Sequence, residues 1–194
     1  MLTASTNGIT KVLRESSNLF DIEYNAWFPF NDADTLFKIS LTRENDEDAK
    51  NSTVKLPSPI DITSPFAWET FTAADQVNVA WQPSNQGDTV KINICYECTR
   101  TDSFGSRSTI SSSRTLSVKN DPGILYYTVA RLINVPNPAI YDQGCEIELT
   151  LIRSRKGKLD SNFREGGSIG AVQTDTVNFF YIPDRIFQTE ENNT

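Results

Sequence analysis

Residues 90–98 read Val90-Lys91-Ile92-Asn93-Ile94-Cys95-Tyr96-Glu97-Cys98, and this stretch decides the fold class. Apolar side chains stand at the even positions from Val90 to Tyr96, whereas the odd positions are mainly polar. A period of two is typical of a β-strand with one face buried and the other in water. Strands that are buried on one face only are characteristic of antiparallel sheets. The stretch therefore predicts an antiparallel β-sheet.

The same alternation recurs along the chain. It appears in 76–81, in 146–151 and in 20–28. In segment 20–28, we expect the apolar side chains at every second position to fill the core: Phe20, Ile22, Tyr24, Ala26 and Phe28. Asn7-Gly8 stands between two short strand-like segments, as in a two-residue hairpin turn. Only residues 127–134 could hold even a short helix. The sequence therefore predicts an all-β protein.

A proline-rich segment indicates a domain boundary. Leu56-Pro57-Ser58-Pro59 lacks two backbone donors and cannot lie in a central strand. We therefore predict a small N-terminal β module over 1–58, a larger β module over 59–185 and a polar tail over 186–194. A module of about 58 residues is marginal alone, so we expect it to pack on the second module.

Composition excludes several functions. The 194 residues include 18 basic and 25 acidic side chains, for a net charge of −7, and no histidine. The negative charge argues against binding to nucleic acid or to an anionic membrane surface. Without histidine the chain cannot form a Ser-His-Asp or Cys-His catalytic centre, or a histidine-ligated metal site. No apolar run has the roughly 18 residues of a membrane span, so we expect membrane association only through a lipid anchor absent from this chain.

The second module resembles fibronectin type III and related immunoglobulin-like domains. Val77-Asn78-Val79-Ala80-Trp81-Gln82-Pro83 is similar to their second strand, which ends in a buried tryptophan followed by proline. Val90 to Tyr96 and Tyr141 to Arg153 resemble later strands. Through Ile62–Pro65 and Leu159–Gly167, the module also resembles uncharacterised secreted proteins or lipoproteins of proteobacteria. The resemblance implies an immunoglobulin-like sandwich with no catalytic residues to transfer, and it leaves the strand order of 99–120 open.

The three cysteines fit this resemblance. Alternation places Cys98 on the buried face and Cys95 in water, and Cys145 points inward with its apolar neighbours. In an immunoglobulin-like order the two strands are antiparallel neighbours, which implies a disulfide between Cys98 and Cys145. A disulfide favours an oxidising compartment, whereas the alternative is three reduced thiols in a cytosolic protein. The Cys95/Cys98 pair has too few partners for a zinc site and lies on a strand, unlike redox motifs at helix N-termini.

Several charged groups admit a functional and a simple structural interpretation. Residues 31–34 and 44–48 could supply oxygen ligands for calcium, although neither matches an EF-hand loop, and they could equally be solvated loops. Glu146 and Glu148 project from one strand face, whereas glycoside hydrolysis normally takes its two carboxylates from different strands. The basic run Arg153, Arg155, Lys156 and Lys158 is expected to keep a hairpin tip near Gly157 soluble.

Trp27 and Trp68 are the candidate partner-binding residues. If 20–28 is a one-sided strand, Trp27 faces outward, and Trp68 is expected to be exposed near the start of the second module. Exposed tryptophans can stack on sugars or anchor a protein partner. Alternatively, they cover the contact between the two modules.

These observations favour a non-catalytic binding or spacer module in the cell envelope, periplasmic or surface-exposed, or outside the cell. It would present loops or a sheet face to a protein or glycan partner, with no cofactor. Two alternatives stay open: a carboxylate-dependent, glycan-active enzyme, and a structural component of a surface assembly. The fold class alone does not decide among them.

Overall fold

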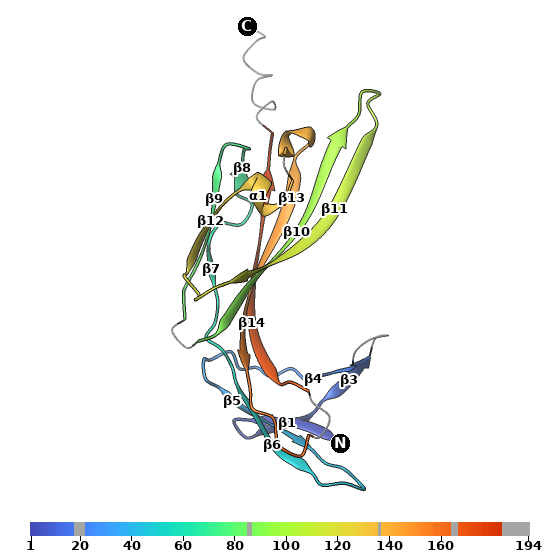
Figure 1. Cartoon of the computed structure of the whole chain (residues 1–194), viewed down its shortest axis with the longest axis vertical. Coiled ribbons are helices and arrows are strands. Elements are labelled where there is room, and N and C mark those ends of the chain that lie inside the picture. The colour runs from blue at the N-terminus through green and yellow to red at the C-terminus, as the bar shows by residue number, and fades with distance from the viewer. Residues whose placement is uncertain (18–21, 85–86, 136, 164–166, 184–194) are drawn as a thin grey trace. The chain divides into compact units, whose positions relative to one another are not determined.

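The computed structural model describes residues 1–17, 22–84, 87–135, 137–163 and 167–183 (Figure 1). Its described residues form β-strands with two short helical turns, so the all-β prediction is confirmed. The chain divides into two compact units. Unit 1 comprises Met1–Pro59 and Arg153–Gln173, and unit 2 comprises Ile60–Ile152 and resumes at Thr174.

This division differs from the predicted one because Arg153–Gln173 returns to unit 1. Thr53 and Lys158 exchange two backbone hydrogen bonds of 2.8 and 2.7 Å, which adds the returning segment to the first unit. A Cβ at Gly157 would lie 2.4 Å from the carbonyl oxygen of Thr53, so only glycine fits this close approach. The expected hairpin tip at Gly157 is therefore wrong. The predicted tail at 186–194 lies outside the described residues.

Unit 1 contains a four-stranded antiparallel sheet. Its order is β2-β1-β5-β6, with bounds Ile9–Val12, Leu2–Thr6, Leu36–Leu41 and Ala49–Lys55. Asn7 and Gly8 both have positive φ, at 47° and 78°, which confirms the predicted turn between β1 and β2. The side chains buried in this unit are few, and several are small or polar.

A two-stranded ribbon of β3 (Arg14–Ser17) and β4 (Ile22–Asn25) also belongs to unit 1. The prediction that 20–28 fills a core is wrong for this ribbon, because Ile22 is 58 % exposed and Tyr24 45 %. The Tyr24 hydroxyl instead donates to Glu15 at 3.0 Å. Phe28 is half-buried against Phe37, and Phe20 lies outside the described residues.

Unit 2 is built from two sheets. The five-stranded sheet has the order β11-β10-β13-β14-β8, with bounds Arg107–Val118, Thr89–Thr101, Cys145–Lys156, Gly170–Tyr181 and Thr70–Phe71. The end of β13 at 153–156 and the start of β14 at 170–173 belong to unit 1. The three-stranded sheet has the order β12-β9-β7, with bounds Ile124–Thr128, Gln76–Trp81 and Ile62–Ser64. β8 pairs with β14 in parallel, whereas β11 pairs with β10, and β12 and β7 with β9, in antiparallel fashion.

One apolar cluster joins the two sheets of unit 2. The buried positions of β9 are Val77, Val79 and Trp81, and those of β13 in this cluster run from Cys145 to Leu151 at every second residue. The Trp81 indole N–H donates to the buried Asp121 carboxylate at 2.6 Å, which satisfies its polar atom. The expected burial of Trp81 is therefore confirmed.

Two helical turns complete the unit. The short helix α1 (Val129–Leu132) lies within the segment predicted to hold one, and the Thr128 hydroxyl caps it by accepting from the Arg131 N–H. A 3-10 turn spans Pro138–Ile140. Val129 and Leu132 are fully buried, so α1 contributes to the core of the sandwich.

Candidate functional site

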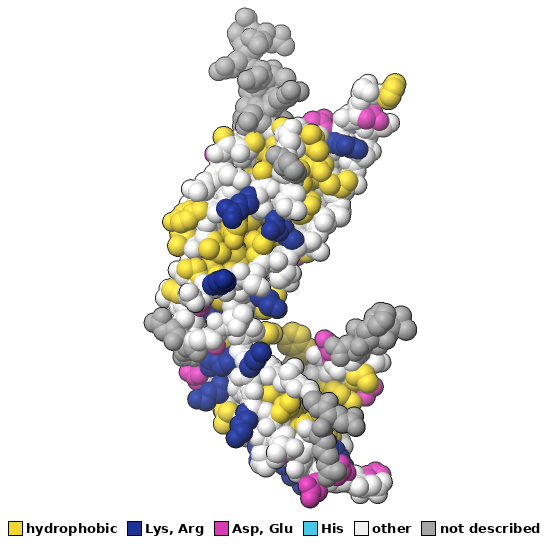
Figure 2. Space-filling view, viewed as in Figure 1, with side chains coloured by type: hydrophobic (Ala, Val, Ile, Leu, Met, Phe, Trp, Pro, Cys, Tyr) yellow, Lys and Arg dark blue, Asp and Glu magenta, His cyan; other side chains and the backbone are white. Residues whose placement is uncertain are grey.

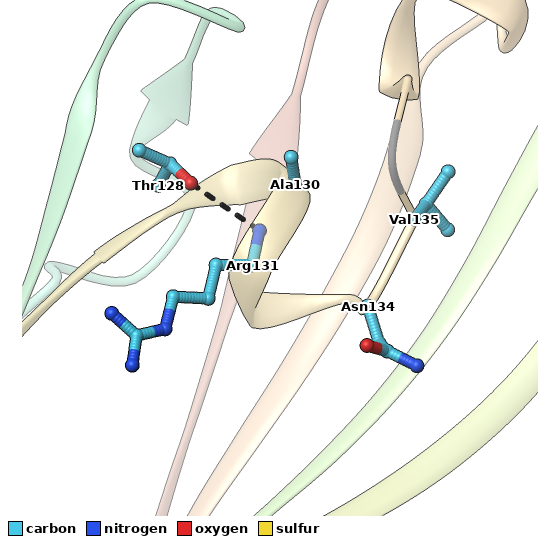
Figure 3. A pocket seen from close by; sticks show the side chains of 5 residues that line it. All are labelled: Thr128, Ala130, Arg131, Asn134 and Val135. Carbon is cyan, nitrogen blue, oxygen red and sulfur yellow. Dashed lines mark hydrogen bonds between the residues drawn. The ribbon is translucent and has the colours of Figure 1, made fainter.

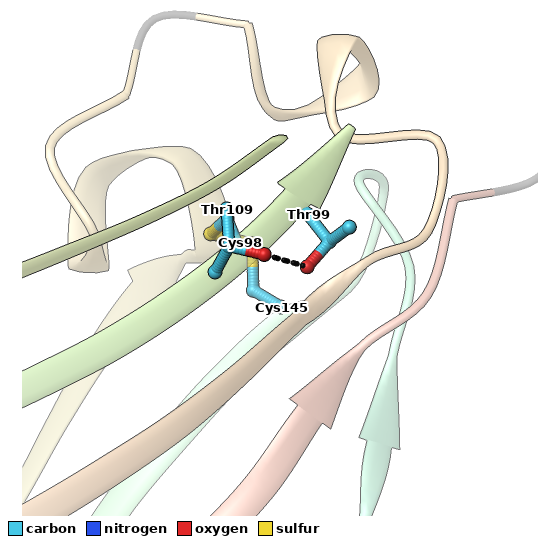
Figure 4. The surroundings of a disulfide bond; sticks show 4 residues. All are labelled: Cys98, Thr99, Thr109 and Cys145. Carbon is cyan, nitrogen blue, oxygen red and sulfur yellow. Dashed lines mark hydrogen bonds between the residues drawn. A yellow bond between two sulfur atoms is a disulfide. The ribbon is translucent and has the colours of Figure 1, made fainter. Parts of the chain in front are cut away.

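Cys98 and Cys145 form a disulfide, as expected (Figure 4). The end of β10 meets the start of β13 here, because the Thr99 N–H donates to the Gly144 carbonyl at 3.0 Å. The Asp142 carboxylate accepts from the Thr101 N–H at 2.6 Å, and this hydrogen bond holds the pKa of Asp142 below its usual value. The disulfide therefore ties together two neighbouring strands of the five-stranded sheet.

The alternation of β10 separates a buried face from a polar face. Val90, Ile92, Ile94 and Cys98 are fully buried, whereas Cys95 is an exposed free thiol. The exposed side chains of β10 and its neighbours gather around a shallow, open depression. We call this surface the polar face, and define it by Cys95, Glu97, Ser111, Ser113, Glu146, Glu148 and Asn178.

Side-chain hydrogen bonds join the strands across this side of the sheet. Ser111 donates to Glu97 at 3.3 Å, and Thr99 and Thr109 share a hydrogen bond of 3.0 Å that is visible beside the disulfide (Figure 4). Thr150 and Thr176 are joined in the same way at 2.9 Å. Such cross-strand pairs order the side chains and leave them accessible to a ligand.

Trp68 lies at the edge of the sheet next to the polar face. Its backbone N–H donates to the Asn178 carbonyl at 2.7 Å, and its ring stacks on Phe180 with centroids 5.7 Å apart. The indole is nevertheless 61 % exposed. Its φ of 66° lies in the left-handed region, which costs a bulky residue about 1–3 kcal/mol. An exposed aromatic ring thus lies stacked on Phe180 beside the polar face.

Trp27, the other predicted partner-binding residue, lies in unit 1. Its side chain is 89 % exposed, as the sequence led us to expect. Lys11 donates to its carbonyl oxygen and places its ammonium group 5.2 Å from the centroid of the Phe28 ring. Unlike Trp68, Trp27 stacks on no other aromatic ring among the described residues.

The carboxylates of the polar face come from two strands. Glu97 belongs to β10, and Glu146 and Glu148 belong to β13. All three are exposed around the same depression. A carboxyl group that acts as general acid usually lies in an enclosed apolar site, and an open polar face does not provide one. The three carboxylates can accept hydrogen bonds from a ligand at this open surface.

The acidic stretches of unit 1 are engaged in local contacts. The Asp48 carboxylate accepts from the Lys50 ammonium and from the Arg43 N–H, and these contacts lower its pKa. Asp34 pairs with Arg155 at 2.6 Å. Among the described residues, no three His, Cys, Asp or Glu side chains gather in a way that could hold a metal ion.

Half of the basic run at 153–158 is structural. Arg153 is fully buried and donates to the carbonyl oxygens of Ser58 and Pro59. Arg155 joins Asp34 and the Leu56 carbonyl. Lys156 and Lys158 are exposed. The interpretation of the whole run as a solvated tip is therefore wrong for its two arginines.

A smaller hollow lies beside α1 (Figure 3). It is lined by Thr128, Ala130, Arg131, Asn134 and Val135. The Arg131 guanidinium lies 5.7 Å from the centroid of the Tyr127 ring, and the Thr128 hydroxyl is used in the helix cap. The hollow therefore offers fewer free polar groups than the polar face.

Sequence reasoning found part of this site. It singled out Trp68, Cys95, Glu146 and Glu148, but missed Glu97, Ser111, Ser113 and Asn178. Strand pairing brings the missed residues of β10 and β11 into this surface, because Glu97 lies opposite Ser111 and Cys95 opposite Ser113. Alternation in 107–117 was a usable signal, since small hydroxyl side chains occupy most of its odd positions.

A search against known protein families finds no match, and no curated protein is significantly similar to the chain. In the described part of the chain, no helix is both long and apolar enough to cross a membrane. Lys and Arg side chains (dark blue in Figure 2) are spread among hydrophobic and uncharged polar side chains over the face shown. The functional proposal therefore depends on the geometry of the chain itself.

Proposed function

We propose that this protein is a non-catalytic binding module that presents the polar face of unit 2 to a protein or glycan partner. The observation that carries the proposal is the combination of Trp68, stacked on Phe180 and exposed beside the sheet, with an open surface of carboxylate, amide and hydroxyl groups. Aromatic rings supply contact area at low entropic cost, and the polar groups supply directed hydrogen bonds.

The strand order supports a relationship to immunoglobulin-like domains. If β7, β9 and β12 correspond to strands A, B and E, then β10, β13 and β14 correspond to C, F and G. β11 then takes the position next to C. The disulfide departs from the antibody pattern, because it joins two strands of one sheet rather than the two sheets. Immunoglobulin-like sandwiches frequently serve in recognition at cell surfaces.

The disulfide also supports a location in the cell envelope or outside the cell. Disulfides persist in oxidising compartments and are rare in reducing ones. We propose a secreted or surface-attached protein on this ground, with any membrane attachment provided by a lipid anchor. A glycan-active enzyme is the second candidate function. We place it second because Glu97, Glu146 and Glu148, the candidate catalytic carboxylates, are exposed on an open face rather than enclosed in a cleft.

Matched tryptophan variants test the proposal. Wild-type protein is applied to arrays of defined glycans and of surface-protein peptides, beside Trp68→Ala and Trp27→Ala. Binding that is lost in Trp68→Ala and kept in Trp27→Ala supports the polar face. The reverse pattern assigns binding to unit 1 and contradicts the proposal.

Cys95 provides a second route to the same test, because its thiol is exposed within the polar face. Coupling a bulky maleimide to Cys95 should abolish binding without unfolding the sandwich. The control is Cys95→Ala treated with the same reagent, which should bind as before. Unchanged binding after complete modification of Cys95 contradicts the proposal.

A further inference from the structure

β11 forms a long, open edge of the five-stranded sheet. Its twelve residues pair with β10 without a register shift, from Val90 opposite Val118 to Thr101 opposite Arg107. No described strand pairs with its other side, and Figure 1 shows β11 as the outermost strand. Strands commonly have about 5–6 residues, so this edge is long.

Two backbone hydrogen bonds show which backbone groups of β11 point outward. The Asp102 N–H donates to the Ser106 carbonyl, which makes 102 and 106 a hydrogen-bonded pair. The Thr99 N–H donates instead to Gly144 on the β13 side. Because hydrogen-bonded pairs alternate in an antiparallel ladder, the even residues of β11 bond to β10. The odd residues from Arg107 to Ser117 therefore present their N–H and C=O groups at the open edge.

This edge lacks the usual protection against pairing. Natural proteins block open edges with proline, lysine, bulges or short strands. β11 contains no proline, lysine or acidic residue, and its only charged side chains are Arg107 and Arg114. Arg114 is also engaged, because it donates to the Arg131 carbonyl at 2.8 Å. The edge is therefore suited to the addition of another strand.

The sequence of β11 allows two copies of the strand to pair with each other. The four central odd positions of β11 are Thr109, Ser111, Ser113 and Thr115, and their order is the same in both directions about Ser112. The outer odd positions, Arg107 and Ser117, would face each other in this register. Antiparallel pairing of two copies about Ser112 places threonine opposite threonine and serine opposite serine. Hydroxyl pairs of this kind are favourable in sheets. In the same register Arg114 faces an isoleucine of the second copy, so no like charges meet.

We propose that a second copy of this chain pairs with β11 in antiparallel fashion, about a two-fold axis at Ser112, to form a homodimer. The contact is isologous, because each copy contributes the same strand. It joins two five-stranded sheets into one, which makes the polar faces of the two copies continuous. The pairing itself does not depend on the proposed binding function.

Sedimentation equilibrium of the full chain tests the dimer, with Ser113→Pro as the main variant. Proline removes the outward N–H at 113 and leaves the bonds to β10 intact, which is tolerated at a sheet edge. Wild type should be a dimer at micromolar concentration, and Ser113→Pro should be a folded monomer by circular dichroism. Ser113→Ala keeps the N–H and should remain dimeric. A monomeric wild type, or a dimer that survives Ser113→Pro, overturns the proposal.

A charge pair tests the register and covers the case that Ser113→Pro fails to fold. Thr109 of one copy lies opposite Thr115 of the other in the proposed pairing. The double variant Thr109→Lys, Thr115→Lys should lose the dimer, because lysines then face each other twice. The double variant Thr109→Lys, Thr115→Glu should keep it, because opposite charges meet. Equal behaviour of the two variants overturns the register.

Discussion

Unit 1 and unit 2 bury different kinds of side chains. In unit 2, one apolar cluster includes strands of both sheets and the helix α1. Among the described residues of unit 1, the buried apolar side chains include Ala4, Ala49, Val54 and Leu56, and they are accompanied by buried polar or charged groups: Thr6, Ser52, Arg153 and Asp160. Larger apolar side chains of unit 1 stay exposed, among them Val12, Ile22, Trp27 and Leu36.

This difference shows that the two units are stabilised by different interactions. Unit 2 gains from burial of apolar area and from the disulfide, which are insensitive to moderate changes of pH. Unit 1 relies on hydrogen bonds to carbonyl, carboxylate and hydroxyl groups, and its returning segment takes part in several of them. Hydrogen bonds contribute little net free energy each but are costly to break when a partner is left buried.

Removal of the disulfide should have the largest effect. Cys98→Ala with Cys145→Ala opens a loop with a sequence separation of 47 residues. Loss of that constraint should lower the free energy of unfolding of unit 2 by about 4 kcal/mol. Urea denaturation followed by tryptophan fluorescence measures it, because Trp81 is buried in unit 2 whereas Trp27 and Trp68 are exposed. Cys95→Ala is the control and should leave the midpoint unchanged. An equal loss in both would contradict the assigned pairing.

A neighbouring pair of substitutions on β13 tests the core of unit 2. Leu149 is fully buried, so Leu149→Ala should cost about 3 kcal/mol through lost burial and a cavity. Glu148 is the adjacent, exposed residue, and Glu148→Ala should change the free energy of unfolding by less than about 0.5 kcal/mol. The same urea experiment measures both. Similar costs at the two positions would show that this strand is not buried on one face.

Arg153 tests the contrasting character of unit 1. Arg153→Ala leaves the Ser58 and Pro59 carbonyls without their guanidinium donor, and should destabilise unit 1 by about 2 kcal/mol. The nearby exposed Lys156→Ala serves as the control. Hydrogen exchange measured by mass spectrometry localises the effect, which should appear in β5 and β6 rather than in β9 and β10. Uniform loosening of both units would contradict the comparison.

The pH dependence of unit 1 should give the smallest effect. Backbone N–H groups of Asn162 and Asn51 lower the pKa of Asp160 from 3.8. A carboxyl pKa that is lower in the folded state stabilises the fold above the unfolded value and loses this contribution as the pH falls below it. Unit 1 should therefore lose stability on acidification below about pH 4.

The variant Asp160→Asn separates this contribution from other acid effects. Thermal unfolding is recorded from about pH 6 to about pH 3 in wild type and variant. The variant should be less stable at the upper end, and the difference should shrink toward the lower end. A difference that stays constant with pH would show that the Asp160 charge does not stabilise unit 1.

The sequence predicted correctly the features that depend only on neighbouring residues, namely the buried face of β10 and the first hairpin turn. The alternation of Val90–Cys98 fixed the buried face of β10, and Asn7-Gly8 fixed the first hairpin because its φ angles require these residue types. The same alternation misled at 22–25. Period two shows that a strand has two different faces, but it does not show that an apolar face finds a partner, and this ribbon leaves its face exposed.

Long-range contacts explain the other differences. The return of Arg153–Gln173 to unit 1 depends on the close approach of Gly157 to Thr53, more than a hundred residues away in the chain. The position of Trp68 depends on its contact with β14. The polar face could not be predicted without the strand order, because its residues come from four strands. Alternation marks one face of a strand, as in 107–117, but it does not show which strands lie side by side.

Differential alkylation of the native, non-reduced protein tests the central claim that β10 divides a disulfide-linked core from an exposed polar face. One reagent is applied before reduction and an isotopically distinct one after it, followed by peptide mass mapping. The structure predicts that Cys95 carries the first label, and that Cys98 and Cys145 carry only the second. First-step labelling of Cys98 and Cys145 in protein from its native source, or protection of Cys95, would contradict the orientation of β10 and the polar face built on it.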